Sequence, residues 1–280
     1  MSTPRRIIQI LSARPSTDGD GVRIQRTIGQ NRHDMDPFLM VDEIRSENRA
    51  DYVGGFPPHP HRGIETLTYM IAGGFVHEDS MGHRAELRDG GAQWMSAGRG
   101  VIHSELPLIQ DGLLHGFQLW INLAASQKMK PAAYKQAARE ELPTLSLSNG
   151  AVVRSFGGSW QIEGHMLTSP LADFSANART LDVILPANGT LAMSLPSEDT
   201  VLAYVFEGSL ASTPIVGSQQ LARFSQGEQL VLQAGEKGAR LLLLAGTALQ
   251  EPIVQYGPFV MNTETEIQQA IDDYRNNRLV

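Results

Sequence analysis

The stretch Phe56-Pro-Pro-His-Pro-His-Arg-Gly-Ile-Glu65, followed about forty residues later by Gly98-Arg-Gly-Val-Ile-His-Ser-Glu105, indicates how this chain folds. Each stretch places two side chains that can bind a metal at positions i and i+2: His59 with His61, and His103 with Glu105. Residues two apart on a β-strand point to the same face of the sheet. If the two strands face each other across a small barrel, three imidazoles and one carboxylate converge, a ligand set that suits first-row transition metals.

Three prolines in the first stretch, at positions 57, 58 and 60, allow a different interpretation in which both histidines lie in a surface turn. The distribution of histidine favours the metal site. Seven of the eight histidines lie within residues 33 to 115, and only His165 lies outside that range. Because a second ligand pair and flanking glycines accompany the first pair, we favour a shared site over a turn.

The composition excludes several classes of function. A length of 280 residues allows one large domain or two of about half that size. The 27 glycines and 15 prolines imply many turns and favour a β-rich protein. A formal net charge of −7 argues against general binding to nucleic acid or to anionic membranes. The absence of cysteine excludes disulfides, thiolate ligands and cysteine nucleophiles.

No segment of the sequence is predicted to enter a membrane. The first apolar run, at residues 7 to 11, is interrupted by Gln9 and is too short for the core of a signal peptide. No stretch approaches the roughly 18 apolar residues of a transmembrane helix. We therefore expect a cytoplasmic protein.

The strand pattern predicts two all-β domains. About eight short β-forming runs with tight turns lie between residues 6 and 122, without a βαβ rhythm, which favours a closed antiparallel barrel or double-sheet jelly roll. A second series of strands runs from residue 152 to 245. We place an N-terminal barrel at 1–130, a polar linker, with at most a helical turn, at 131–150, and a C-terminal barrel at 151–280.

The two halves can be aligned as a diverged repeat by their glycine turns. In that register Ser194 and Pro196 stand where His59 and His61 stand, and Arg240 stands where His103 does. The second barrel is therefore predicted to lack a metal site.

The chain is predicted to end in a helix at about 263–276. Thr263 and Glu266 form a capping box, in which each side chain satisfies a backbone N–H of the other. Ile267, Ala270, Ile271 and Tyr274 then follow at the spacing of one apolar helical stripe. We interpret this helix as a packing element without chemistry.

Several segments together resemble the pirin family of the cupin superfamily. They are Pro57-Pro-His-Pro-His-Arg-Gly-Ile-Glu-Thr66, Gly91-Ala-Gln-Trp-Met-Ser-Ala-Gly-Arg-Gly-Val-Ile-His-Ser-Glu105, Phe117-Gln-Leu-Trp-Ile-Asn-Leu123 and Glu251-Pro-Ile-Val-Gln-Tyr-Gly-Pro-Phe-Val-Met-Asn-Thr263. The resemblance covers nearly the whole chain. It implies an all-β bicupin, two antiparallel barrels with metal only in the N-terminal one, and a short C-terminal helix.

The resemblance also implies one divalent metal per chain, usually iron as Fe(II), with Mn, Ni, Cu, Co or Zn as alternatives. The family's ligand pattern carries over to His59, His61, His103 and Glu105. The wider cupin superfamily often uses the Glu shortly after the histidine pair, here Glu65, as its fourth ligand. We favour Glu105, because strand geometry places it beside His103, and we leave Glu65 as an acceptor that orients a histidine.

The activity implied by the resemblance is that of a quercetin 2,3-dioxygenase, in which O2 opens a flavonol and CO is released. Glu105 is the candidate base for the flavonol 3-hydroxyl. The alternative is a non-enzymatic, metal- or redox-dependent regulator that binds a transcription-related or metabolic protein partner. The sequence does not decide between the enzyme and the regulator. It also leaves three roles open for His77, Glu78, Asp79 and His83: residues that support the metal ligands, the rim of a pocket, or an ordinary polar hairpin.

Overall fold

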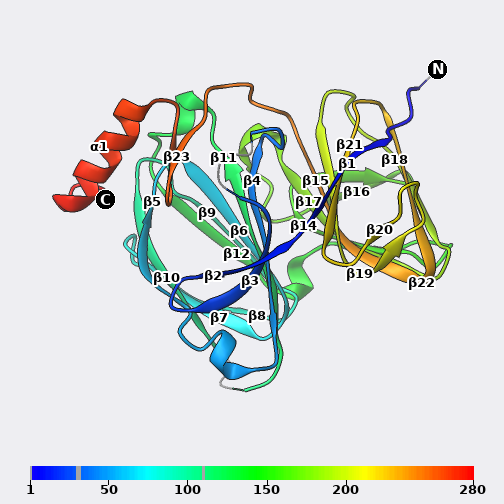
Figure 1. Cartoon of the computed structure of the whole chain (residues 1–280), viewed down its shortest axis with the longest axis horizontal. Coiled ribbons are helices and arrows are strands. Elements are labelled where there is room, and N and C mark those ends of the chain that lie inside the picture. Colours follow the sequence, from blue (N-terminus) through cyan, green and yellow to red (C-terminus); the bar gives the residue numbers. More distant parts are fainter. Residues whose placement is uncertain (1, 30–32, 109–110) are drawn as a thin grey trace. The chain divides into compact units, whose positions relative to one another are not determined.

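The computed structural model describes residues 2–29, 33–108 and 111–280. The chain forms two compact units, each built from antiparallel strands (Figure 1). The first, which we call the N-terminal barrel, comprises Arg14–Arg139 and Leu249–Val280. The second, the C-terminal barrel, comprises Met1–Ala13 and Glu140–Ala248. The predicted all-β bicupin with one short C-terminal helix is confirmed.

The N-terminal barrel consists of a seven-stranded and a four-stranded sheet. The larger sheet has the order β12-β9-β6-β11-β4-β3-β2, and the smaller has the order β5-β10-β7-β8. All neighbouring strands are antiparallel. Their bounds are β2 (Arg14–Asp18), β3 (Val22–Ile28), β4 (Phe38–Ser46), β5 (Phe56–His61), β6 (Ile64–Ala72), β7 (Gly74–Asp79), β8 (Arg84–Arg88), β9 (Ala92–Ser96), β10 (Val101–Pro107), β11 (Leu114–Asn122) and β12 (Ala133–Ala137).

The C-terminal barrel is organised around one long strand, β22 (Gln229–Gly246). Its first part, Gln229–Gln233, pairs with β18, and its second part, Ala239–Ala245, pairs with β17. This one strand therefore has different neighbours along its length. The other strands are β1 (Ile7–Ser12), β13 (Thr144–Ser146), β14 (Val152–Gly157), β15 (Ser159–Ile162), β16 (His165–Thr168), β17 (Arg179–Leu185), β18 (Thr190–Ser194), β19 (Thr200–Leu210), β20 (Val216–Gly217) and β21 (Gln220–Phe224).

The interior of the C-terminal barrel is an apolar core. Val183, Leu191, Val201 and Leu243 are among its many aliphatic members, and Trp160 and Phe224 add two aromatic rings. In β18, Leu191 and Met193 are buried and their neighbours along the strand are exposed. Burial alternates with a period of two residues, as expected of a strand with one face in the core. This unit is therefore stabilised by packing of side chains that carry no chemistry.

The two units are interleaved in the sequence, whereas the boundaries expected near residues 130 and 151 were sequential. Strand β1 pairs with β21 and so joins the C-terminal barrel, although it opens the chain. The last thirty-two residues, Leu249–Val280, belong to the N-terminal barrel. They include strands β23 (Val254–Tyr256) and β24 (Phe259–Met261) and the helix, orange to red in Figure 1.

Residues 131–150, interpreted as a linker with at most a helical turn, contain two strands, and this is a correction. Strand β12 pairs with β9 and extends the larger sheet of the N-terminal barrel, and β13 pairs with β14. Only four one-turn 3₁₀ segments interrupt the described strands: Arg49–Asp51, Ala125–Gln127, Arg139–Glu141 and Ser175–Asn177. The Lys- and Gln-rich sequence of β12 has low β-propensity, but sheet pairing overrides such local preferences.

The helix α1 (Glu264–Arg275) begins where the capping box predicts. The Thr263 side chain accepts from the backbone N–H of Glu266, and the Glu266 carboxylate accepts from the backbone N–H of Thr263. Ile267 and Ala270 are buried against Phe259 and Met261 of β24. The helix therefore packs on the N-terminal barrel. Among the described helices, none has the length and apolarity needed to cross a membrane.

Candidate metal centre

Strand pairing brings the three predicted histidine ligands together. Strands β5 and β10 are antiparallel neighbours, with His59 opposite His103 and His61 opposite Val101. The three ring centroids lie 4.4 to 5.0 Å apart. One candidate ligand atom from each of His59, His61 and His103 lies within 4.8 Å of the others, which is the spacing a single metal ion can bridge.

The hydrogen bonds of these rings leave ligand nitrogens free for a metal. The Nδ1 atoms of His59 and His61 lie 2.8 and 3.4 Å from the carbonyl oxygens of Pro57 and Pro258, to which they can donate. The Nε2 atoms of His61 and His103 are buried without a hydrogen-bond partner in the described chain. Because a buried unpaired nitrogen is costly, this arrangement fits a site that a metal completes.

Burial keeps the three imidazoles neutral, which is the form that binds metal. Burial lowers the pKa of His61 to about 3, and the neighbouring His59 acts in the same direction. Burial likewise holds the pKa of His59 below and that of His103 well below the usual value. At neutral pH each ring therefore offers a lone pair.

Glu105 lies beside this cluster but not in it. It follows His103 by two residues on β10 and is buried, yet its carboxylate is outside the group of atoms within 4.8 Å. Its Oε1 accepts hydrogen bonds from Thr68 (3.1 Å) and Gln93 (2.5 Å), and its Oε2 lies 3.4 Å from Gln118 Nε2. Burial raises the pKa of Glu105 to about 7, against the hydrogen bonds of Thr68 and Gln93. Its role as fourth ligand and base stays a prediction.

Glu65, the alternative carboxylate, has a different environment. Its Oε1 lies 3.2 Å from the Nζ of Lys130, and the carboxylate is outside the histidine cluster. Gly63 separates β5 from β6 with a φ of +81°, so the alternation of faces is broken between His61 and Glu65. This turn explains why a short sequence distance from the histidine pair does not bring Glu65 to the site.

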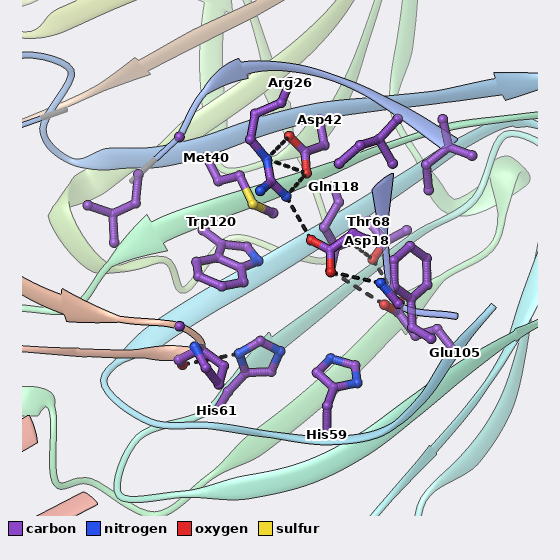
Figure 2. Close-up of a pocket in the computed structure, with 18 of the residues that line it drawn as sticks. Asp18, Arg26, Met40, Asp42, His59, His61, Thr68, Glu105, Gln118 and Trp120 are labelled. Atoms are coloured by element: carbon purple, nitrogen blue, oxygen red, sulfur yellow. Dashed lines mark hydrogen bonds and ion pairs between the residues drawn. The ribbon is translucent and has the colours of Figure 1, made fainter. Parts of the chain in front are cut away.

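A cavity of about 600 Å³ opens at the histidines, a size usual for small-molecule sites. Figure 2 shows His59 and His61 on one side of it and the Arg26–Asp42 pair across from them. Its apolar lining includes Ile24, Leu39, Met40, Ile44, Phe56, Phe75 and Trp120, and its polar lining includes Asp18, Arg26, Asp42, Thr68, Glu105 and Gln118. Trp120 stands edge-on to His61, with centroids 5.2 Å apart. The cavity therefore suits a flat, largely apolar molecule with a few polar groups.

An ion pair forms part of the wall opposite the histidines. Arg26 donates from Nε to Asp42 Oδ1 (2.9 Å) and from a terminal nitrogen to Asp42 Oδ2 (2.6 Å). The same terminal nitrogen lies 2.8 Å from Asp18 Oδ2. Because two carboxylates flank one guanidinium, this end of the cavity favours ligand groups that donate hydrogen bonds.

The end of the chain completes the site. Gln255, Gly257 and Pro258, around the turn between β23 and β24, line the cavity, and Pro258 contacts His61. A Cβ at Gly63 would lie 2.0 Å from the Val260 carbonyl oxygen, so glycine permits this close approach. The segment Glu251–Thr263 was singled out by its resemblance alone, and its position beside the histidines was not predicted.

Several site residues were missed although the sequence carries a signal for them. Thr68, Gln93 and Gln118 are polar residues within largely apolar strands. Asp42 is a charged residue that directly follows the apolar run Phe38–Val41 in β4. Buried polar groups need partners, so such positions indicate an interior network. His115, in contrast, pairs with Glu43 (2.9 Å), as expected of a satisfied barrel histidine.

The fold and the site define a class of protein, a bicupin whose N-terminal barrel carries a candidate metal centre. Known proteins refine this class. The sequence matches the family described as Pirin over residues 21–121 and the Pirin C-terminal cupin domain over residues 180–280. A Vibrio cholerae protein, named provisionally as a quercetin 2,3-dioxygenase, is 47% identical over 98% of this chain and 97% of its own length.

Two further proteins extend this comparison. A Pseudomonas aeruginosa protein with the same provisional name is 44% identical over 100% of this chain and 99% of its own length. The crystal structure of a quercetin 2,3-dioxygenase from Acinetobacter baumannii superposes with a TM-score of 0.89 at 29% identity and covers 98% of each chain. The chain belongs to the pirin family.

Proposed function

We propose that this protein is a metal-dependent dioxygenase of the quercetin 2,3-dioxygenase type, which opens a flavonol with O2 and releases CO. The observation that carries the proposal is a pair of buried Nε2 atoms, those of His61 and His103, that have no hydrogen-bond partner in the described chain. They lie next to a largely apolar cavity that His59 and His61 line. A structural histidine cluster would not need an adjoining cavity of about 600 Å³.

His59, His61, His103 and Glu105 would hold one divalent metal, with Fe(II) as our first choice. The chemistry of this ligand set equally admits Mn, Ni, Cu, Co or Zn. When bound, the metal supplies the electronic link between flavonol and O2 that this spin-forbidden reaction requires. Four protein ligands would leave coordination positions open for small molecules, as catalytic metal sites do.

Glu105 would accept the proton of the flavonol 3-hydroxyl. A carboxyl whose pKa burial raises to about 7 is well matched to proton transfer near neutral pH. The hydrogen bonds from Thr68 and Gln93 to its Oε1 fix the orientation of the carboxylate. Phe56, Phe75 and the other apolar lining residues would enclose the flat ring system and exclude water.

The names of the relatives support the same reaction. Two bacterial relatives that match nearly the whole chain are named provisionally for it, and a solved neighbour of similar length bears the enzyme's name. The Arg26–Asp42 end of the cavity would receive the phenolic hydroxyls of the substrate, since its carboxylates accept hydrogen bonds.

An oxygen electrode tests the proposal directly. Iron-loaded protein should consume one O2 for each quercetin, with CO detected in the headspace. His103→Ala should lower the rate by orders of magnitude, whereas His165→Ala, an exposed histidine of the C-terminal barrel, should not. A flavone that lacks the 3-hydroxyl should not react. Equal traces from His103→Ala and the parent protein would contradict the enzyme and leave the non-enzymatic regulator.

A further inference from the structure

A fourth histidine, His77 on β7, contacts the candidate ligand His103 from outside the cluster. The two Nδ1 atoms lie 3.5 Å apart, at the long limit of a hydrogen bond, and the ring centroids are 5.3 Å apart. Strand β7 pairs with β10, so the backbone of the two strands fixes this neighbourhood. The His77 side chain is fully buried, although it is not among the candidate ligands.

Asp79 holds the other side of the His77 ring. Its Oδ2 lies 3.1 Å from His77 Nε2, and its side chain is also fully buried. Its Oδ1 accepts hydrogen bonds from the backbone N–H groups of Met81 (2.9 Å) and His83 (3.1 Å). The turn between β7 and β8 therefore fixes this carboxylate before any metal is present.

This arrangement selects one tautomer of each histidine. The Asp79 carboxylate accepts the backbone N–H groups of Met81 and His83, and toward His77 Nε2 it presents an oxygen that accepts a hydrogen bond. His77 must then donate from Nε2, and as a neutral ring it has a lone pair on Nδ1. The hydrogen between the two Nδ1 atoms therefore belongs to His103, which leaves the lone pair of His103 on Nε2.

Tyr134 fixes the plane of the His77 ring. The two rings stack with centroids 4.3 Å apart and an interplanar angle of 18°. The Tyr134 hydroxyl lies 3.2 Å from Gln93 Oε1, and Gln93 in turn donates to Glu105. Tyr134, on the edge strand β12, thus contacts both His77, which supports His103, and Gln93, which supports Glu105.

We propose that His77 and Asp79 are positioning residues that set the tautomer of His103, direct its Nε2 toward the metal and strengthen it as a ligand. This inference rests on the metal centre of the proposed function but not on the flavonol reaction. An imidazole that donates to a carboxylate-backed partner is a better ligand, and the loss of such outer partners typically weakens metal binding about 10- to 100-fold.

Binding of Co(II) to the metal-free protein, measured by competition with a chelator, tests this assignment without substrate. His77→Phe keeps an aromatic ring against Tyr134 and should weaken Co(II) binding about 10- to 100-fold. His77→Asn should recover part of the loss, because its Oδ1 can still accept from His103. The ligand-field absorption of bound Co(II) should shift in His77→Phe, and ¹⁵N NMR should show mixed His103 tautomers in the metal-free variant.

Asp79→Asn gives a second, nearly isosteric variant, and Glu78→Gln is its matched control. Glu78 directly precedes Asp79 on β7, its replacement by Gln removes the same charge, and its exposed carboxylate forms an ion pair with Arg84. Asp79→Asn should weaken Co(II) binding, and Glu78→Gln should leave it unchanged. Equal binding by Glu78→Gln and Asp79→Asn, or by parent and His77→Phe, would overturn the inference.

The failure of the proposed reaction would look different. A parent protein that binds Co(II) at the histidines but does not consume quercetin would contradict only the dioxygenase. A parent that binds no Co(II) would overturn the metal centre and the positioning role together. If His77→Asn loses as much Co(II) binding as His77→Phe, the hydrogen-bond acceptor at this position does not support the metal. His77 would then be a packing residue, and its positioning role would be wrong.

Discussion

In the N-terminal barrel, strands β5 and β10 bring three imidazoles together beside a cavity, whereas the interior of the C-terminal barrel is filled with apolar side chains. The residues that the sequence register sets against His59 and His103 are Ser194 and Arg240. Ser194 is exposed at the end of β18, and Arg240 forms an ion pair with Asp182 (2.7 Å). The same fold thus encloses a cavity beside a histidine cluster in one unit and a packed apolar core in the other.

The difference shows what a functional interior costs. The buried Nε2 atoms of His61 and His103 lack partners among the residues that the structure describes, and buried Glu105 has a raised pKa, so each opposes folding until a ligand or proton compensates it. The core cluster of the C-terminal barrel has one such atom among the described residues, Trp160 Nε1, but it contains no titratable side chain. We expect the two barrels to respond differently to the same perturbations.

The largest effect should come from Glu105→Gln in the N-terminal barrel. The amide cannot accept the flavonol proton, so kcat should fall by roughly 10²- to 10⁴-fold, the contribution typical of general base catalysis. Glu65→Gln should reduce turnover less, because Glu65 faces Lys130. Steady-state O2 uptake with quercetin measures both variants. The reverse ranking would mean that this chain uses the general cupin pattern.

His61→Ala should abolish most metal binding, with a loss greater than the roughly 100-fold expected for an outer-shell partner. The circular dichroism spectrum should hardly change, since the strand pairing does not depend on this side chain. Metal analysis of anaerobically purified protein should fall from about one ion per chain in the parent. The control is Ser194→Ala in the C-terminal barrel. Full occupancy in His61→Ala, or loss in Ser194→Ala, would reverse the assignment of the two barrels.

Leu243→Ala tests whether the core of the C-terminal barrel contributes to stability without contributing to metal binding. Leu243 is fully buried in the apolar core, so its truncation should lower the free energy of unfolding by about 2–5 kcal/mol. The metal content of the folded protein should not change. Urea unfolding and metal analysis on the same samples give both quantities. A metal loss that parallels the loss of stability would show that the site depends on the C-terminal core.

The smallest predicted effect is a pH dependence confined to the metal-free N-terminal barrel. An unfolded histidine has a pKa of about 6.5, whereas burial lowers that of His61 to about 3. Between these values the unfolded chain binds a proton that the folded chain does not. Stability is therefore complete above the unfolded pKa and falls as the pH decreases, by at most about 1.4 kcal/mol per pH unit.

Hydrogen exchange at pH 5 to 7, resolved by segment, measures this dependence in each barrel. Exchange protection of β5 and β10 should decrease as the pH falls, and that of β17 and β22 should change less. His61→Gln should flatten the dependence. Equal slopes for the two barrels, or for parent and His61→Gln, would remove the histidines as its cause.

Local sequence determined much of this protein. Ligand pairs at i and i+2 share a face on any strand, so the convergence of His59, His61 and His103 followed from two short stretches. The capping box of Thr263 and Glu266 likewise set the start of the helix. Both patterns act over a few residues, which is the range in which side-chain spacing alone fixes direction.

Tertiary structure decided the rest, because it depends on residues that are distant in the sequence. The return of Pro258 to His61 spans 197 positions, and β1 crosses to β21. The strand β12 exists only because β9 offers it an unpaired edge, against its own low β-propensity. The sequence predicted Glu105 as a ligand beside His103, whereas the folded chain bonds its carboxylate to Thr68 and Gln93, outside the histidine cluster.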